Sequence, residues 1–252
     1  MGETYHSRFG AIQESRHVFI EHGLKLFRHG GLGIQGPCAR NSSGRLAVLE
    51  VGFGTGLNAF LTLIESDIQS TPVDYTSVEA HPLPDVIYQR LNYSEKLARP
   101  DLQNIFLRMH AAPTGQTTSL TKNFNFTKQI VMAQKFITPQ KFDLIYFDAF
   151  APDKQPEMWS CDMLKKMYGF LNDGGMLTTY CAKGVFRRHL KEIGFQVESF
   201  PGPPGKREMT VAEREGFEPS LRFPVNTLSK RAPSATRPSL QKLSKHIPYC
   251  YF

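Results

Sequence analysis

One short stretch constrains the fold more than any other. Residues 46–58, LAVLEVGFGTGLN, join an apolar run to three glycines at alternate positions and then to a helical pattern. Glycine lacks a Cβ atom, so the backbone can turn sharply there and a ligand can approach it closely. A helix that begins directly afterwards offers free N–H groups. The stretch therefore predicts a buried strand, a ligand-binding loop and a helix.

The spacing of the glycines indicates which ligand. In the dinucleotide fingerprint GxGxxG the third glycine comes one residue later than it does here, where Leu57 takes that position. GxGxG preceded by an acid, here Glu50, is the S-adenosylmethionine variant. Glu50 or its neighbourhood can pair with the methionine ammonium of that cofactor, which NAD lacks.

A second acid supports the same cofactor. Glu79 ends the next predicted strand, where a carboxylate can accept hydrogen bonds from both ribose hydroxyls. Taken alone, the glycine loop could be a tight strand–helix turn without a ligand, and Glu79 could be a solvated acid at a strand end. Taken together they predict S-adenosyl-L-methionine as cofactor, bound by Glu50, Gly52, Gly54, Thr55, Gly56, Asn58 and Glu79.

Strand and helix patterns alternate along the rest of the chain. This alternation predicts an α/β fold of the Rossmann-like S-adenosylmethionine-dependent methyltransferase class, with a doubly wound, mostly parallel, seven-stranded sheet. The predicted strands are 46–51, 75–80, 104–110, 142–150, 176–182, 195–200 and an antiparallel 206–212. The predicted helices are 56–66, 82–98, 156–171 and 183–193, with 124–132 as an inserted hairpin and 14–27 as a short helix or a strand pair.

Composition divides the chain into three parts. We expect residues 1–45 to be an extension covering substrate and cofactor, 46–211 to be the methyltransferase domain, and 212–252 to be a disordered tail. The tail resembles a segment that recurs at the ends of unrelated predicted bacterial proteins, which favours a spurious origin. It carries +4 of the net charge of +7, so overall charge is weak evidence for an RNA partner.

The remaining composition limits the cell compartment. No stretch of 18 apolar residues exists, and no basic segment followed by an apolar one opens the chain, so we expect a cytoplasmic protein without a membrane span. The four cysteines form no CxxC pair and are interpreted as reduced thiols rather than metal ligands; they are Cys38, Cys161, Cys181 and Cys250.

The predicted strand FDLIYFDAF leads into a second candidate segment. Asp148 ends this strand, at the sheet edge where open α/β sheets bind ligands. Phe150, Pro152, Pro156 and Trp159 follow and can wall an apolar slot for a flat substrate. A carboxylate there can hold a substrate ammonium and help to deprotonate it. The alternatives are that Asp148 caps a helix or loop and that Trp159 anchors the core.

The segment DAFAPDKQPEMWS resembles the signature of the methyltransferase family that completes the tRNA wobble modification 5-methylaminomethyl-2-thiouridine. Three further segments are similar to that family: YHSRFGAIQESRHVFI (5–20), LEVGFGTGLNAFL (49–61) and the stretch from 174 to 209 that ends in GKREM. The resemblance covers roughly residues 3–210. It indicates the free-standing form, without a flavin-binding oxidase half.

The resemblance implies a reaction and several roles. The primary amine of 5-aminomethyl(-2-thio)uridine at the tRNA wobble position would attack the cofactor methyl, and Asp148 would hold that amine. Gln13 and Glu14 would close over the cofactor, and Tyr5 and His6 would line the pocket. A wobble base would unstack to reach aromatics such as Phe150. Candidates for phosphate contacts, each equally readable as a solvated charge, are Lys183, Arg187, Arg188, Lys206 and Arg207.

Two other functions remain open from the residues alone. A polyamine aminopropyltransferase uses a related fold and a catalytic Asp, although its polycationic substrate calls for a more acidic chain. A non-catalytic RNA-binding relative could keep the fold, against which the intact glycine loop, Glu79 and Asp148 argue weakly. No metal is expected in any of these cases.

Overall fold

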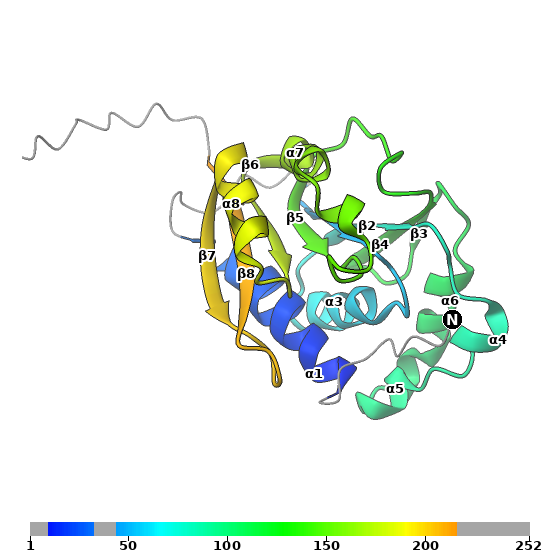
Figure 1. Ribbon diagram of the computed structural model, residues 1–252. Helices are drawn as coiled ribbons and strands as arrows, with labels where there is room; N and C mark the ends of the chain where they lie inside the picture. Colours follow the sequence, from blue (N-terminus) through cyan, green and yellow to red (C-terminus); the bar gives the residue numbers. More distant parts are fainter. Residues whose placement is uncertain (1–9, 33–43, 216–252) are drawn as a thin grey trace, which may run out of the picture. The chain divides into compact units, whose positions relative to one another are not determined.

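The computed structural model describes residues 10–32 and 44–215, and the fold is an α/β sheet with helices on both faces (Figure 1). Eight strands form one sheet in the order β3-β4-β2-β1-β5-β6-β8-β7. The five strands from β4 to β6 are parallel, and β3, β8 and β7 pair antiparallel. Their bounds are Leu46–Val51 (β1), Val73–Glu79 (β2), Thr117–Ser119 (β3), Phe124–Ile130 (β4), Phe142–Phe147 (β5), Leu171–Thr179 (β6), Phe195–Pro201 (β7) and Glu208–Arg214 (β8).

The fold class is confirmed, while one predicted strand is wrong. Residues 104–110 belong to helix α6 (Gln103–Ala111), which buries Phe106, Met109 and His110. Positions 106, 109 and 110 have helical spacing, and the apolar run 105–107 hides this period.

The segment predicted as an inserted hairpin is a central strand. Phe124 and Phe126 in β4 are fully buried and alternate with Asn125 and Thr127, and β4 pairs in parallel with β2. Strand β3 adds an antiparallel edge beside it. Losing one predicted strand and gaining these two gives eight strands instead of seven.

Helices cover the two faces of the sheet and divide the core in two. One core packs α3 (Leu57–Ile68) and α6 against the sheet, and the other packs α7 (Cys161–Phe170) and α8 (Gly184–Ile193). Predicted helix 82–98 is mostly loop around α4 (Asp85–Tyr88) and α5 (Tyr93–Lys96). The remaining short turns are η2 (Pro100–Leu102) and η3 (Pro156–Trp159).

The N-terminal segment is one continuous helix on the α3 face. It comprises α1 (Ala11–Ser15), a π-helical stretch η1 (Arg16–Lys25) and α2 (Leu26–Arg28). The helix buries Val18, whose carbonyl accepts a 3.1 Å hydrogen bond from the Thr178 hydroxyl of β6. Its packing against β6, β5 and α3 makes this segment part of the domain core, and its predicted covering of substrate and cofactor stays a prediction.

The ends of the domain differ slightly from the expected boundaries. Strand β8 continues to Arg214, three residues past the predicted limit of 211. Most of the predicted tail, from 216 onward, lies outside the described residues, as do residues 1–9 and 33–43. No helix in the described ranges has the length and apolar character needed to cross a membrane.

The N-terminal helix packs so closely on the sheet at Gly23 that a side chain there should destabilise the fold. A Cβ at Gly23 would lie 3.0 Å from Thr178 Cγ2 and 3.1 Å from Tyr146 Cε1. Gly23→Leu should therefore lower the free energy of unfolding by about 1–3 kcal/mol, because added volume forces packed groups apart. Urea unfolding followed by circular dichroism measures the change.

Gly169 in α7 is the matched control, since a Cβ there would meet no atom within 4 Å. Gly169→Ala should raise the stability by up to about 1 kcal/mol through helix propensity. A Gly23→Leu protein as stable as the parent would contradict the packing described for this helix.

Candidate active site

The glycine loop is built against the strand that carries Asp148. Gly52 has φ +96°, and its N–H donates to the Val78 carbonyl at 2.9 Å. A Cβ at Gly52 would come within 2.5 Å of the Asp148 carbonyl oxygen. Only glycine fits there, so the loop and the end of β5 lie in direct backbone contact.

Glu79 closes the loop from the adjacent strand. Its Oε2 accepts a 3.0 Å hydrogen bond from the Gly54 N–H, and its Oε1 accepts one at 2.8 Å from the His81 N–H. The side chain is half-buried at the carboxyl edge of the sheet. It is therefore beside the glycine loop, as a ribose-binding acid must be, and its contact with ribose stays a prediction.

A histidine that the sequence reading missed supports the far end of the loop. His110 Nε2 donates to the Thr55 carbonyl at 3.2 Å, and the ring stacks on Tyr88 with centroids 4.5 Å apart. Burial lowers the pKa of His110 to about 4, so the ring is neutral at pH 7. A Cβ at Gly56 would reach 2.9 Å from this nitrogen, and the Thr55 hydroxyl accepts a 3.1 Å bond from Tyr93.

Glu50 lies beneath the loop rather than at its surface. The side chain is fully buried, and its Oε2 accepts a 2.8 Å hydrogen bond from the Ser77 hydroxyl. Burial raises the pKa of Glu50 well above its usual range, and the charge of nearby Asp148 adds to the rise. Glu50 thus has no exposed surface in the structure, and its pairing with the methionine ammonium stays a prediction.

Asn58 connects this buried acid to the candidate catalytic one. Its Nδ2 donates to Asp148 Oδ2 at 2.9 Å. Glu50 Oε1 and Asn58 Oδ1 are buried and have no hydrogen-bond partner among the described residues. The buried Tyr75 hydroxyl also lies next to Glu50 and interacts with it. Asn58 is therefore mainly a support for Asp148.

Asp148 has the character of an acid–base group. Burial raises the pKa of its carboxyl to about 6. The hydrogen bond from Asn58 and the positive charge of Lys206 lower this pKa, whereas the negative charge of Glu14 raises it. A carboxyl with this pKa is mostly ionised at pH 7 and can still accept a proton readily.

Distant segments of the chain meet beside Asp148. Lys206, in the turn between β7 and β8, forms an ion pair with Glu14 of α1 and lies 4.0 Å from the centroid of the Tyr180 ring. The Tyr180 hydroxyl donates to the Ala149 carbonyl at 2.6 Å. Tyr180 was not predicted, and nothing in its local sequence marks it.

The predicted slot is only partly as expected. Phe150 is 44% exposed and Pro152 is half-buried, so both can face a substrate. Trp159 is only 6% exposed, packs edge-on against Phe147 and Phe186, and donates from Nε1 to the Phe150 carbonyl at 2.8 Å. It anchors the loop from inside, as the alternative interpretation expected, and its role as a wall of a substrate slot stays a prediction.

The predicted basic contacts also separate into groups. Arg187 bonds to Glu208 Oε2 at 2.8 Å and to Thr210 and the Met209 carbonyl, so it braces β8 and is not free for phosphate. Lys183 pairs with Asp153 on the surface, while Arg188 and Arg207 are exposed.

The remaining predicted site residues lie near the start of the described chain or before it. Gln13 is exposed on α1, next to Glu14. Tyr5 and His6 lie outside the described residues.

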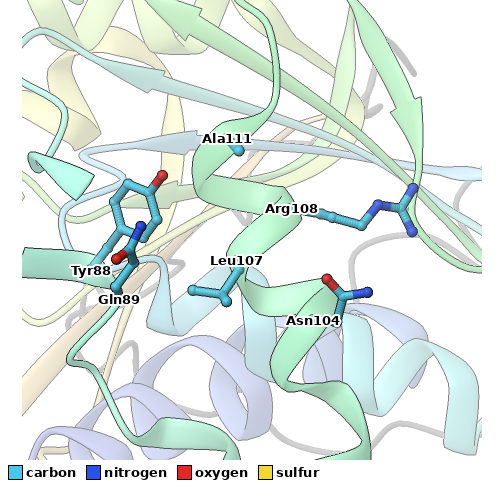
Figure 2. A pocket seen from close by; sticks show the side chains of 6 residues that line it. All are labelled: Tyr88, Gln89, Asn104, Leu107, Arg108 and Ala111. Carbon is cyan, nitrogen blue, oxygen red and sulfur yellow. The ribbon is translucent and has the colours of Figure 1, made fainter. Parts of the chain in front are cut away.

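A separate surface pocket is formed between the end of α4 and helix α6 (Figure 2). The stacked rings of Tyr88 and His110 stand between this pocket and the glycine loop. It is therefore not part of the Asp148 site. Its lining residues are Tyr88, Gln89, Asn104, Leu107, Arg108 and Ala111.

Comparisons with known proteins agree with this geometry. Residues 96–215 match a family described as S-adenosyl-L-methionine-dependent methyltransferase. The tRNA 5-methylaminomethyl-2-thiouridine biosynthesis bifunctional protein MnmC of Ralstonia nicotianae is 28% identical, over 92% of this chain and 33% of that protein. Its counterpart in Delftia acidovorans is 31% identical, over 82% of this chain and 31% of that protein. The chain thus spans about a third of the length of these relatives.

A solved structure is also similar. MNMC2 from Aquifex aeolicus superposes with a TM-score of 0.62 at 23% identity, covering 85% of this chain and 64% of that one, which supports the fold.

Residues 96–215 thus match S-adenosylmethionine-dependent methyltransferases, which use S-adenosylmethionine as cofactor, and the glycine loop and Glu79 precede the matched residues in the chain. The structure fits that cofactor, because the Gly52 turn leaves no room for a Cβ and Glu79 lies beside it.

The backbone contact at Gly52 predicts a loss of cofactor affinity on substitution. Gly52→Ala should weaken S-adenosylmethionine binding at least about tenfold, the equivalent of roughly 1.4 kcal/mol, because the new Cβ pushes the loop from the Asp148 carbonyl. Isothermal titration calorimetry measures the affinity.

Gly30→Ala is the matched control. Gly30 has a similar φ of +103° but open space around its Cβ position. This variant introduces a Cβ at a positive φ angle without a steric clash. Equal losses of affinity in both variants would rule out the clash with the Asp148 carbonyl as the cause.

Proposed function

We propose that this methyltransferase transfers the methyl group of S-adenosylmethionine to the primary amine of 5-aminomethyl(-2-thio)uridine at the tRNA wobble position. The observation that carries the proposal is Asp148, a half-buried carboxylate in backbone contact with the cofactor loop and with a pKa of about 6. The names of the MnmC relatives point to the same modified nucleoside.

Asp148 accounts for the choice of an amine. A primary alkylamine is an ammonium ion at neutral pH and has no lone pair for attack. The ionised carboxylate attracts this cation and accepts its proton, directly or through water. S-adenosylmethionine, when bound, supplies an electrophilic methyl group on sulfur. The freed nitrogen lone pair then forms the N–C bond as the S–C bond breaks, giving the methylaminomethyl nucleoside and S-adenosylhomocysteine.

The rest of the chain positions the two reactants. The backbone of residues 52–56 and the Glu79 carboxylate would hold the cofactor, with Gln13 and Glu14 of α1 next to it. Asn58 fixes one oxygen of Asp148, so the other oxygen is left to face the amine. This restriction matters because an in-line displacement depends mainly on alignment.

The polynucleotide would enter beside the β7–β8 turn. Exposed Phe150 can stack on an unstacked base, and Lys206, Arg207 and Arg188 can contact phosphates. Arg187 is excluded from this set by its bonds to β8. The described part of the chain thus offers few basic contacts, consistent with recognition centred on the wobble nucleotide.

The direct test is methylation of tRNA purified from cells that lack this modification enzyme. With labelled cofactor, nucleoside mass analysis should show 5-aminomethyluridine-type nucleosides gaining one methyl group. Asp148→Asn should reduce turnover by about 10²–10⁴-fold, because the general base is removed, while cofactor affinity is nearly unchanged. Asp153→Asn, an exposed acid on the same loop, is the matched control and should remain active.

Two outcomes would replace the proposal. Label entering polyamines but not tRNA would support an aminopropyltransferase-like substrate. Absence of cofactor binding in the folded protein would support a non-catalytic RNA-binding relative.

The raised pKa of Asp148 predicts a pH dependence. Protonated Asp148 cannot accept a proton, so the methylation rate should fall as the pH is lowered through about 6. The Asp148→Asn variant should lack this acidic limb. Because the folded-state pKa of about 6 exceeds the usual value of 3.8, Asp148 lowers the stability progressively between these two pH values and by a constant amount above pH 6, so the Asn variant should be no less stable at pH 7. An unchanged acidic limb in that variant would assign the titration to another group.

The charges around Asp148 predict opposite shifts of its pKa. Removing Lys206, as Lys206→Met, should raise the pKa, and removing the Glu14 charge, as Glu14→Gln, should lower it. The carboxyl carbon signal of Asp148, followed by nuclear magnetic resonance in the cofactor-free protein, measures both. Shifts in the same direction would mean that repacking, not charge, moved the pKa.

A further inference from the structure

A second cluster of reactive side chains lies between helices α7 and α8. Cys161 is the first residue of α7, and His189 and Glu192 are three residues apart on α8. Their potential ligand atoms, one from each residue, all lie within 4.8 Å of one another. We propose that Cys161, His189 and Glu192 bind a zinc ion that holds the two helices together.

The histidine is the observation that points to a ligand. His189 Nδ1 is buried and has no hydrogen-bond partner among the described residues. Leaving such a group unsatisfied is costly, whereas a neutral imidazole nitrogen is a common metal ligand. One ring nitrogen of His189 lies within 4.8 Å of the ligand atoms of Cys161 and Glu192, so a cation bound among them would be a partner for the imidazole.

The other two groups complete a donor set that suits zinc. Residues at positions i and i+3 share a helix face, so Glu192 lies beside His189. Cys161 directly follows the N-cap Ser160 at the start of α7, and its thiol can supply a sulfur ligand. One sulfur, one nitrogen and one carboxylate oxygen match zinc chemistry, and water can fill the fourth tetrahedral position.

The position of the cluster indicates a structural role. Trp159, two residues before Cys161, packs against Phe186 of α8 with ring centroids 5.1 Å apart and donates to the Phe150 carbonyl. Zinc at this point would tie the start of α7 to α8 and so hold the loop that carries Phe150. The inferred site lies outside the methyl-transfer chemistry, and it replaces the expectation that Cys161 is a simple reduced thiol.

Cobalt substitution tests the site in the full-length, tag-free protein. Titration with Co²⁺ should give one equivalent with a thiolate-to-cobalt charge-transfer band, and Zn²⁺ should displace it. Competition with a chromophoric chelator gives the zinc affinity. Cys161→Ser should abolish the band, and His189→Ala should weaken zinc binding at least about tenfold. Zinc should also raise the melting temperature of the parent protein but not of the Cys161→Ser variant.

Cys181→Ser is the matched control, since Cys181 is the other cysteine in the described residues and is buried away from this cluster. Its charge-transfer band should persist. No stoichiometric band in the parent protein, or a band that survives Cys161→Ser, would overturn the proposal. Cofactor binding and tRNA methylation are measured separately, so failure of the zinc site would leave the proposed function standing, and the reverse also holds.

Discussion

The contact between Gly52 and the Asp148 carbonyl is the constraint on which the site depends. Strands β1 and β5 are parallel neighbours, with Val51 paired to Phe147, so the loops that follow them leave the sheet at the same point. There is space for the two backbones to touch only because residue 52 has no Cβ. One glycine thus both shapes the cofactor loop and places the candidate base beside it, which couples cofactor binding to the geometry of methyl transfer.

This closeness has an electrostatic cost. The carboxyl groups of Glu50 and Asp148 lie close together at the end of a buried sheet. Burial raises the pKa of both groups, and the charge of Asp148 raises the pKa of Glu50 further. The protein distributes the cost unevenly. Glu50 is fully buried and burial raises its pKa well above the usual range, whereas Asp148 keeps partial exposure, a hydrogen bond from Asn58 and the nearby charge of Lys206. The environment thus leaves Asp148 as a partly exposed carboxylate, with a pKa of about 6, beside the glycine loop.

The sequence predicted those features that depend on local periodicity. The alternating strands and helices, the glycine loop and Asp148 at a strand end all follow from patterns a few residues long. Residues 104–110 were misassigned because three consecutive apolar residues hide the helical period. For Trp159 the sequence left a core anchor and a slot wall both open, because its burial depends on the packing of α8. Tyr180, His110 and Lys206 gain their roles from chain segments far away, which no local pattern records.

The same reasoning explains why the N-terminal helix belongs to the catalytic unit. Glu14 reaches Lys206 across almost the whole sequence, and both charges act on Asp148 in opposite directions. Because the pair is partly exposed, its direct contribution to stability is small. Its effect is instead to hold the lysine over Tyr180, between the β7–β8 turn and the candidate base. The basicity of Asp148 therefore depends on helix α1, and a shift of that helix would change the chemistry before it changed the fold.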